Sequence, residues 1–227
     1  MTQAVSTHNS SFHSVEHDRQ SVPDPDRVAY FEKAGWQAYY DRKWLRVLRL
    51  MVQLNREQFG MSLLTAIAAA VDVVRASLAF APVDNDVPAA TEHLRHFYEK
   101  AGRSGSLRAD AQALAVLEMD YWVVHRQLAV ERRQAPDHTG DIESMVESLA
   151  RLHAALFDAP PEAIRRSAER RAQAAKVVDR ITGFYSTDVA GDWQRVEDHL
   201  REAYRACLLY TSPSPRDRTR SRMPSSA

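Results

Sequence analysis

The chain has 227 residues and a formal net charge of zero, because 30 Lys and Arg side chains balance 30 Asp and Glu side chains. This balance argues against a nucleic-acid-binding protein, which normally carries an excess of basic residues. The single cysteine excludes an internal disulfide framework and a cysteine-ligated zinc site. A chain of this length can bury a sizeable core without cross-links, so one folded domain is expected.

Residues 1–22 are rich in Ser, His and Gln and contain no apolar run. This composition is typical of a disordered segment, and the missing apolar run argues against a signal peptide. We therefore expect a disordered polar arm at residues 1–22, a helical domain at residues 23–206 and a cytoplasmic location.

Capping residues and turn signals divide the helical domain into about seven helices. Asp24 and Pro25 supply an N-cap and a first-turn proline, so the first helix is expected to begin there. It is expected to run to Gly60, with Gly35 as a weak point. The further helices are expected from Ser62 to before Pro82, from 87 to Gly102, from 107 to 134, from the turn "APDHTGD" to Asp158, from Pro160-Pro161 onward, and from 190 to the end of the domain.

The longest apolar stretch, "MSLLTAIAAAVDVVRASLAFA" at residues 61–81, is almost long enough to span a membrane but contains Asp72 and Arg75. We interpret it as a core helix. No segment has the alternating pattern of a strand and no internal repeat is visible, so the fold class is predicted to be all-α. Short connections favour antiparallel neighbours, which predicts a single-domain antiparallel helical bundle without a transmembrane segment. The apolar stripe of the core helix is formed by Leu63, Ile67, Val71, Val74 and Leu78.

Several ionisable side chains fall on the apolar sides of these helices, given a helical repeat of about 100° per residue. Glu118 and His125 do so in the helix at 107–134, and His153, Arg171 and Asp41 do so in other helices. A carboxylate in an apolar interior is costly unless it is paired or neutralised. Glu118 is therefore expected to have a partner, and Arg171 is the first candidate.

Two interpretations of these five residues remain open. In the first, Glu118, His125, His153, Arg171 and Asp41 satisfy one another in a buried structural network. In the second, Glu118, His125 and His153 converge on a pocket, where Glu118 and His125 are catalytic acid/base candidates and all three are candidate ligands for a metal such as Zn or Fe. The first is favoured because the chain lacks the motifs of phosphate-binding loops, zinc proteases and di-iron bundles.

These observations favour a helical binding or interaction module over an enzyme. A protein partner or self-association is left open, no nucleic-acid partner is expected, and no cofactor is predicted. The alternative is a small helical enzyme, or a metal- or cofactor-binding protein, that uses the pocket of Glu118, His125 and His153.

Two other polar clusters are interpreted as solvated surface. Glu92, His96 and Glu99 point away from the apolar side of their helix, and His93 lies at its edge. The arginine-rich stretch "DRKWLRVLRL" at residues 41–50 follows one side of its helix, as a solvated flank does.

The segment "CLLYTSPSPRDRTRSRMPSSA", residues 207–227, resembles the translation of an adapter DNA used in sequencing libraries. One constant adapter segment encodes Cys207 to Asp217, and a second constant segment in the same frame encodes Ser221 to Ala227, across a variable index. The resemblance implies that these residues are not native and that the true C-terminus is lost at or near Ala206. Without the segment the chain has more acidic than basic side chains and no cysteine.

Overall fold

The computed structural model describes residues 23–105, 107–135 and 140–211. These residues contain no strand, which confirms the all-α prediction, and the predicted arm at 1–22 lies outside them, as does 212–227 of the predicted adapter segment. The described residues form eight helices: α1 (Pro25–Tyr40), α2 (Trp44–Phe59), α3 (Leu63–Phe80), α4 (Val87–Arg103), α5 (Ala111–Gln134), α6 (Glu143–Phe157), α7 (Pro161–Thr182) and α8 (Val189–Thr211).

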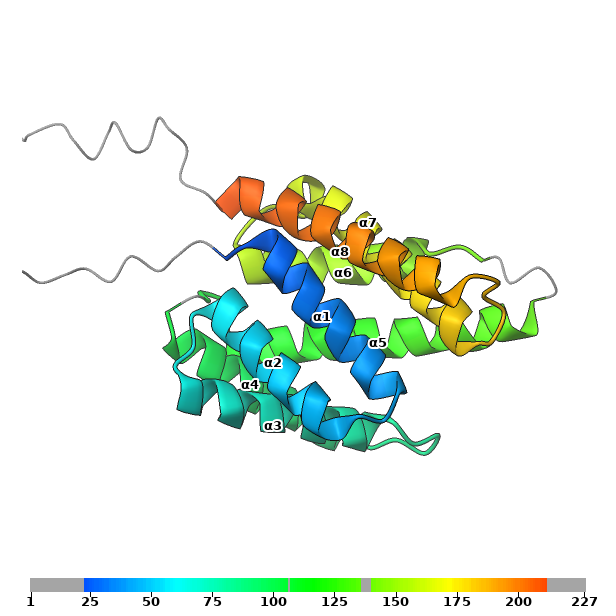
Figure 1. Cartoon of the computed structure of the whole chain (residues 1–227). Helices are drawn as coiled ribbons and strands as arrows, with labels where there is room; N and C mark the ends of the chain where they lie inside the picture. Colours follow the sequence, from blue (N-terminus) through cyan, green and yellow to red (C-terminus); the bar gives the residue numbers. More distant parts are fainter. Residues whose placement is uncertain (1–22, 106, 136–139, 212–227) are drawn as a thin grey trace, which may run out of the picture.

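The eight helices form a closed ring. Each helix packs mainly against the helices before and after it in the sequence, and α8 returns to pack against α1. Figure 1 shows α1 between α8 and α2, with the start of α1 and the end of α8 on the same side of the molecule. Because short connections join successive helices, neighbours run antiparallel around the ring.

The hydrophobic core is divided among the junctions between neighbouring helices. One cluster of buried residues joins α2, α3, α4 and α5 and includes Leu152 of α6, a second joins α5, α6 and α7, a third joins α1, α7 and α8, and a fourth joins α1 and α2. Many of the buried residues are alanines, such as Ala66, Ala90 and Ala115 in the first cluster. The apolar packing therefore holds the helices together around the ring, and members of these clusters such as Phe97 and Tyr121 also line the volume inside it.

Local signals account for several helix ends. The side chains of Ser62 and Asp86 accept hydrogen bonds from the first turns of α3 and α4, as N-caps do. The helix predicted from residue 107 begins later, because the side chain of Asp110 caps α5. Gly60 ends α2 in the left-handed backbone region, with φ of 63°, where a side chain would be strained.

The prediction of one helix from Asp24 to Gly60 is wrong. The chain turns at residues 41–43, where Arg42 adopts φ of 58°, and the turn separates α1 from α2. Gly35, the predicted weak point, lies within α1, where it faces the sulfur of Met51 on α2. The turn changes the helical phase of the residues after it, which affects every inference drawn from one continuous helix.

The orientation of α3 also differs from the prediction. Leu63, Ile67 and Leu78 of the predicted core stripe are exposed. The buried face is formed instead by Ala66, Ala69, Ala70, Asp72, Ala76 and Phe80. Small side chains let α3 approach α2 and α4 closely, so contact distance and not side-chain size decides which face is buried.

Within the described residues, α3 is the one helix that is long and apolar enough to cross a membrane, which by itself is weak evidence for a membrane span. Asp72, near its middle, is buried and forms an ion pair with Lys100 of α4 at 2.6 Å. A charge neutralised by the neighbouring helix fits packing within the ring.

The last helix extends into the segment that resembles adapter DNA. α8 continues to Thr211, and Cys207 lies on the same buried side as Val196, Leu200 and Ala203. The thiol of Cys207 contacts the hydroxyl of Ser167 on α7. The adapter origin concerns where these residues come from, and it stays a prediction.

Replacing Ala69 by leucine is expected to destabilise the protein by about 1–3 kcal/mol, because the larger side chain has no room at the junction of α3 with its neighbours. The matched change Ala68→Leu, at an exposed position, is expected to change the free energy of unfolding by less than about 0.5 kcal/mol. Urea denaturation measures both. Equal effects of the two changes would contradict the orientation of α3.

Candidate functional site

The centre of the ring is a cavity of about 740 Å³, and all eight helices contribute residues to its wall. This volume lies within the range of about 300–1,000 Å³ that is usual for small-molecule sites. Tyr40, Trp44, Leu78 and Val83 line the cavity and are also exposed to solvent, so they form its rim. We refer to this volume as the central cavity.

Aromatic side chains dominate the wall of the central cavity. They come from seven of the eight helices, and they include Trp36, Trp44 and Trp122, three of the four tryptophans of the chain. Aromatic rings provide apolar surface for a ligand and negative faces for a cation. The polar residues described next lie within this aromatic wall.

Glu32 and Arg171 form an ion pair in the wall. The guanidinium of Arg171 contacts both carboxylate oxygens of Glu32, at 2.8 and 2.5 Å, and the hydroxyl of Tyr204 donates to the same carboxylate at 2.6 Å. The guanidinium also lies 5.7 Å from the ring centre of Trp36. The pair joins α1, α7 and α8, and it satisfies Arg171 with a carboxylate other than that of Glu118.

Glu118, on α5, accepts a hydrogen bond from the hydroxyl of Tyr98 on α4. Within the described part of the chain, no ion pair of Glu118 is found. Burial raises the pKa of the Glu118 carboxyl above its ordinary value of 4.5, and it outweighs the hydrogen bond from Tyr98 and the charge of Arg171, which lower the pKa. The surroundings of Glu118 therefore disfavour the ionised form of this carboxyl group relative to a carboxyl group in water.

His153 and His125 each have their own partners. The Nδ1 atom of His153 lies 3.0 Å from the hydroxyl of Ser167. Burial, with a smaller contribution from the charge of Arg171, lowers the pKa of His153 from 6.5 to about 3, so its ring stays neutral at physiological pH. The Nε2 atom of His125 lies 2.9 Å from Asp179, which also pairs with Arg132.

The structure thus places four of the five predicted residues in the wall of the central cavity, in separate groups. Glu118, His125, His153 and Arg171 all line the cavity, but the contacts found join each of them to a different partner. The prediction from the sequence that Asp41 lies in the interior is wrong. Its side chain is exposed and pairs with Lys43, because α1 ends at Tyr40 and Asp41 belongs to the turn.

Two polar atoms of the wall have no hydrogen-bond partner among the described residues. They are the side-chain oxygen of Asn55, a residue that is 1% exposed, and the Nε atom of Arg171. Buried polar atoms are nearly always bonded, so an unpaired atom on a residue that lines a cavity is a candidate partner for a polar group of a ligand or a water.

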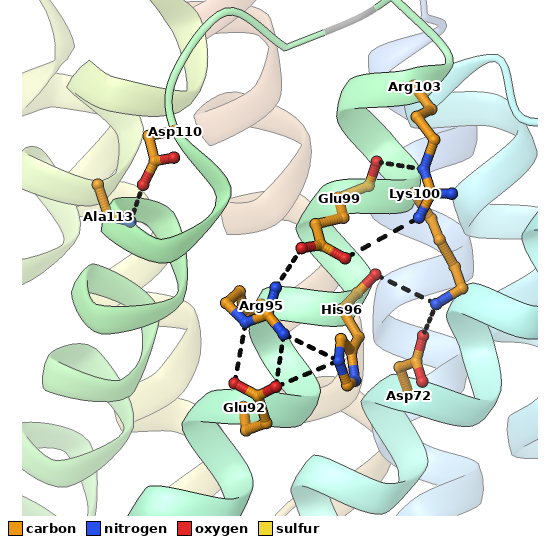
Figure 2. A network of polar contacts seen from close by, with 9 residues as sticks. All are labelled: Asp72, Glu92, Arg95, His96, Glu99, Lys100, Arg103, Asp110 and Ala113. Carbon is orange, nitrogen blue, oxygen red and sulfur yellow. Dashed lines mark hydrogen bonds and ion pairs between the residues drawn. The ribbon is translucent and has the colours of Figure 1, made fainter.

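Another cluster could hold a metal on distance alone. Among the described residues, Asp72, His93 and His96 bring potential ligand atoms within 4.8 Å of one another. Figure 2 shows that Lys100 already bonds Asp72 and that Arg95 lies against His96, at 3.0 Å. These two cations would have to move before a divalent cation could bind, so we interpret the cluster as ion pairing between α3 and α4.

Removing the guanidinium of the wall is expected to cost about 3–5 kcal/mol of stability in the variant Arg171→Met, because Glu32 is left buried without a counter-charge. The neighbouring residue provides a matched control. Arg170 pairs with Glu202 at the surface, so Arg170→Met is expected to cost less than about 1 kcal/mol. Denaturant titration of both variants checks the difference, and a small loss in Arg171→Met would contradict the structural importance of the pair.

The raised pKa of Glu118 predicts how stability depends on pH. A carboxyl whose folded pKa is raised contributes its full stability below the unfolded pKa, near 4.5, and loses it as the pH rises through the folded pKa. Glu118→Gln cannot ionise and is expected to be progressively more stable than the unchanged protein as the pH rises from 4 to 8. Thermal midpoints of both proteins across this range measure the gap.

Glu147→Gln, at an exposed position of α6, controls for the loss of one negative charge. A gap between the unchanged protein and Glu118→Gln that stays constant with pH, or that narrows as the pH rises, would show that folding does not raise the pKa of Glu118.

Comparison of the chain with protein-family models, with curated proteins and with solved structures gives no match. A fold class alone does not define a function, since one fold supports many activities. The function therefore has to be argued from the central cavity and the residues that line it.

Proposed function

We propose that the protein is a binding protein that holds a small, largely apolar molecule in the central cavity. The observation that carries the proposal is that residues of all eight helices line one volume of about 740 Å³, with aromatic side chains and a few ionisable groups in its wall. Volumes of this size are usual for small-molecule sites.

The composition of the wall supports the same proposal. Small-molecule sites combine mostly apolar and aromatic walls with a few polar groups that fix the orientation of the ligand. Here the aromatic wall carries Glu118, His153 and the unpaired oxygen of Asn55. The rim residues Trp44 and Leu78 provide an apolar path from solvent.

Catalysis is the second candidate, and one observation favours it. A carboxyl with a raised pKa in a cavity, such as Glu118, is a suitable general acid or base. His125 and His153, the other candidates, are engaged by Asp179 and Ser167, so the arrangement offers no second group paired with Glu118. The contacts of His125 and His153 each engage one of the two ring nitrogens. A protein partner and a cytoplasmic location remain further proposals.

The binding proposal predicts that the neutral apolar dye 1-N-phenylnaphthylamine binds with one saturable equivalent. Its fluorescence is expected to rise on binding, and the emission of the wall tryptophans is expected to be quenched, because Trp36 and Trp122 lie in the wall. Ala129→Phe, which fills part of the cavity, is expected to weaken binding at least about tenfold, or about 1.4 kcal/mol.

The matched control is Ala113→Phe, at an exposed position of the same helix, α5, and it is expected to bind the dye as the unchanged protein does. Circular dichroism establishes that both variants fold. Dye binding that is not saturable, or that Ala129→Phe leaves unchanged, would rule out the central cavity as the binding site.

A further inference from the structure

The charges in the wall of the central cavity leave one carboxyl group without a counter-charge. Glu32 and Glu118 are two carboxyls near one guanidinium, that of Arg171, and Arg171 binds Glu32 through both of its oxygens. Asp179 is matched separately by Arg132 and His125. Glu118 is thus the carboxyl in the wall for which the described residues provide no cation.

Arg126, a second cation that lines the cavity, has partners of its own. The guanidinium of Arg126 donates to the backbone carbonyls of Phe80, Ala81 and Pro82 and lies 3.8 Å from the ring centre of Phe80. It therefore satisfies backbone carbonyls at the end of α3. Arg133, which also lines the cavity, is exposed.

The surroundings of Glu118 suit an organic cation. Tyr98 on α4 bonds the carboxyl and Trp122 adjoins it on α5, and Tyr121 and Tyr204 contribute further rings to the wall. Aromatic faces attract cations, most strongly where water is excluded. The wall already holds one cation in this way, because the Arg171 guanidinium lies 5.7 Å from the ring centre of Trp36 and 6.0 Å from that of Tyr121.

The oxygen of Asn55 adds an independent observation. It is buried, belongs to a residue that lines the cavity and has no partner among the described residues. It is an acceptor, as is a carboxylate, and a positively charged ligand presents hydrogen-bond donors or polarised C–H groups to such atoms. The Nε–H of Arg171, the other unbonded polar group of the wall, is a donor, so the preference for a cation rests on Glu118, and Asn55 adds an acceptor to the same wall.

We infer that the ligand of the central cavity is an organic cation with an apolar body, held by Glu118 within the aromatic wall. The inference rests on the proposed binding function and specifies the ligand class. Glu118 binds the ligand as a carboxylate, and the ligand supplies the counter-charge that the described residues do not provide, because Arg171 is engaged by Glu32.

Two probes of the same shape test the inference, phenyltrimethylammonium, which is charged, and tert-butylbenzene, which is neutral. Each is titrated against the full chain at pH 8, with 1-N-phenylnaphthylamine displacement and tryptophan quenching as readouts. The cation is expected to bind at least about tenfold more tightly than the neutral isostere, since an uncompensated carboxylate favours a positive charge. Glu118→Gln is expected to abolish this preference, and Glu147→Gln is expected to retain it.

The outcomes separate the two proposals. If the dye binds but the cation binds no better than its isostere, the inference is wrong and the binding function stands. If Glu118→Gln still binds the dye and still prefers the cation, Glu118 is not the counter-charge and the inference is also wrong. If neither dye nor probe binds the unchanged protein, both proposals are wrong. Dye binding by Glu118→Gln itself shows that this variant is folded.

Discussion

The ion pair between Glu32 and Arg171 is the interaction on which the arrangement of the helices depends. It joins α1 to α7 and, through the hydroxyl of Tyr204, to α8, so it fixes the first helix against the last two and closes the ring. A buried ion pair contributes little net stability compared with well-packed apolar residues of the same volume. Its place in the interior is therefore better explained by the polar cavity wall that it forms, since apolar replacements would remove that wall.

Alanine and aromatic side chains occupy different places around the ion pair. Alanines such as Ala69, Ala90 and Ala172 occupy the junctions between helices, where a small side chain lets two backbones approach closely. Aromatic side chains such as Trp36 and Tyr121 lie in the cavity wall. Large aliphatic side chains such as Leu94, Leu149 and Leu200 are buried at the junctions, so the side chains that surround the cavity are mainly aromatic among the large apolar ones.

Features with a local signal could be predicted from the sequence, and features that depend on distant residues could not. The start of α3 follows from the capping side chain of Ser62, whereas the turn at Arg42 lies in "DRK", which has neither glycine nor proline. Missing that turn shifted the helical phase and placed Asp41 in the interior. A helical wheel gives the direction of a side chain, but the partner of Arg171 is Glu32, 139 residues away, and no wheel shows a cavity between helices.

Exposed apolar surface and a left-handed backbone residue both occur at the rim of the central cavity, and both indicate that a ligand enters there. Tyr40, Trp44, Leu78 and Val83 expose apolar surface there, and grouped apolar surface on a protein usually marks a binding region. Tyr40 and Trp44 flank the turn in which Arg42 holds a left-handed backbone, a conformation that persists only where the surrounding structure enforces it. An apolar molecule that enters at this corner meets aromatic side chains first and the charged part of the wall further in, and this order favours a ligand with an apolar body and one polar end.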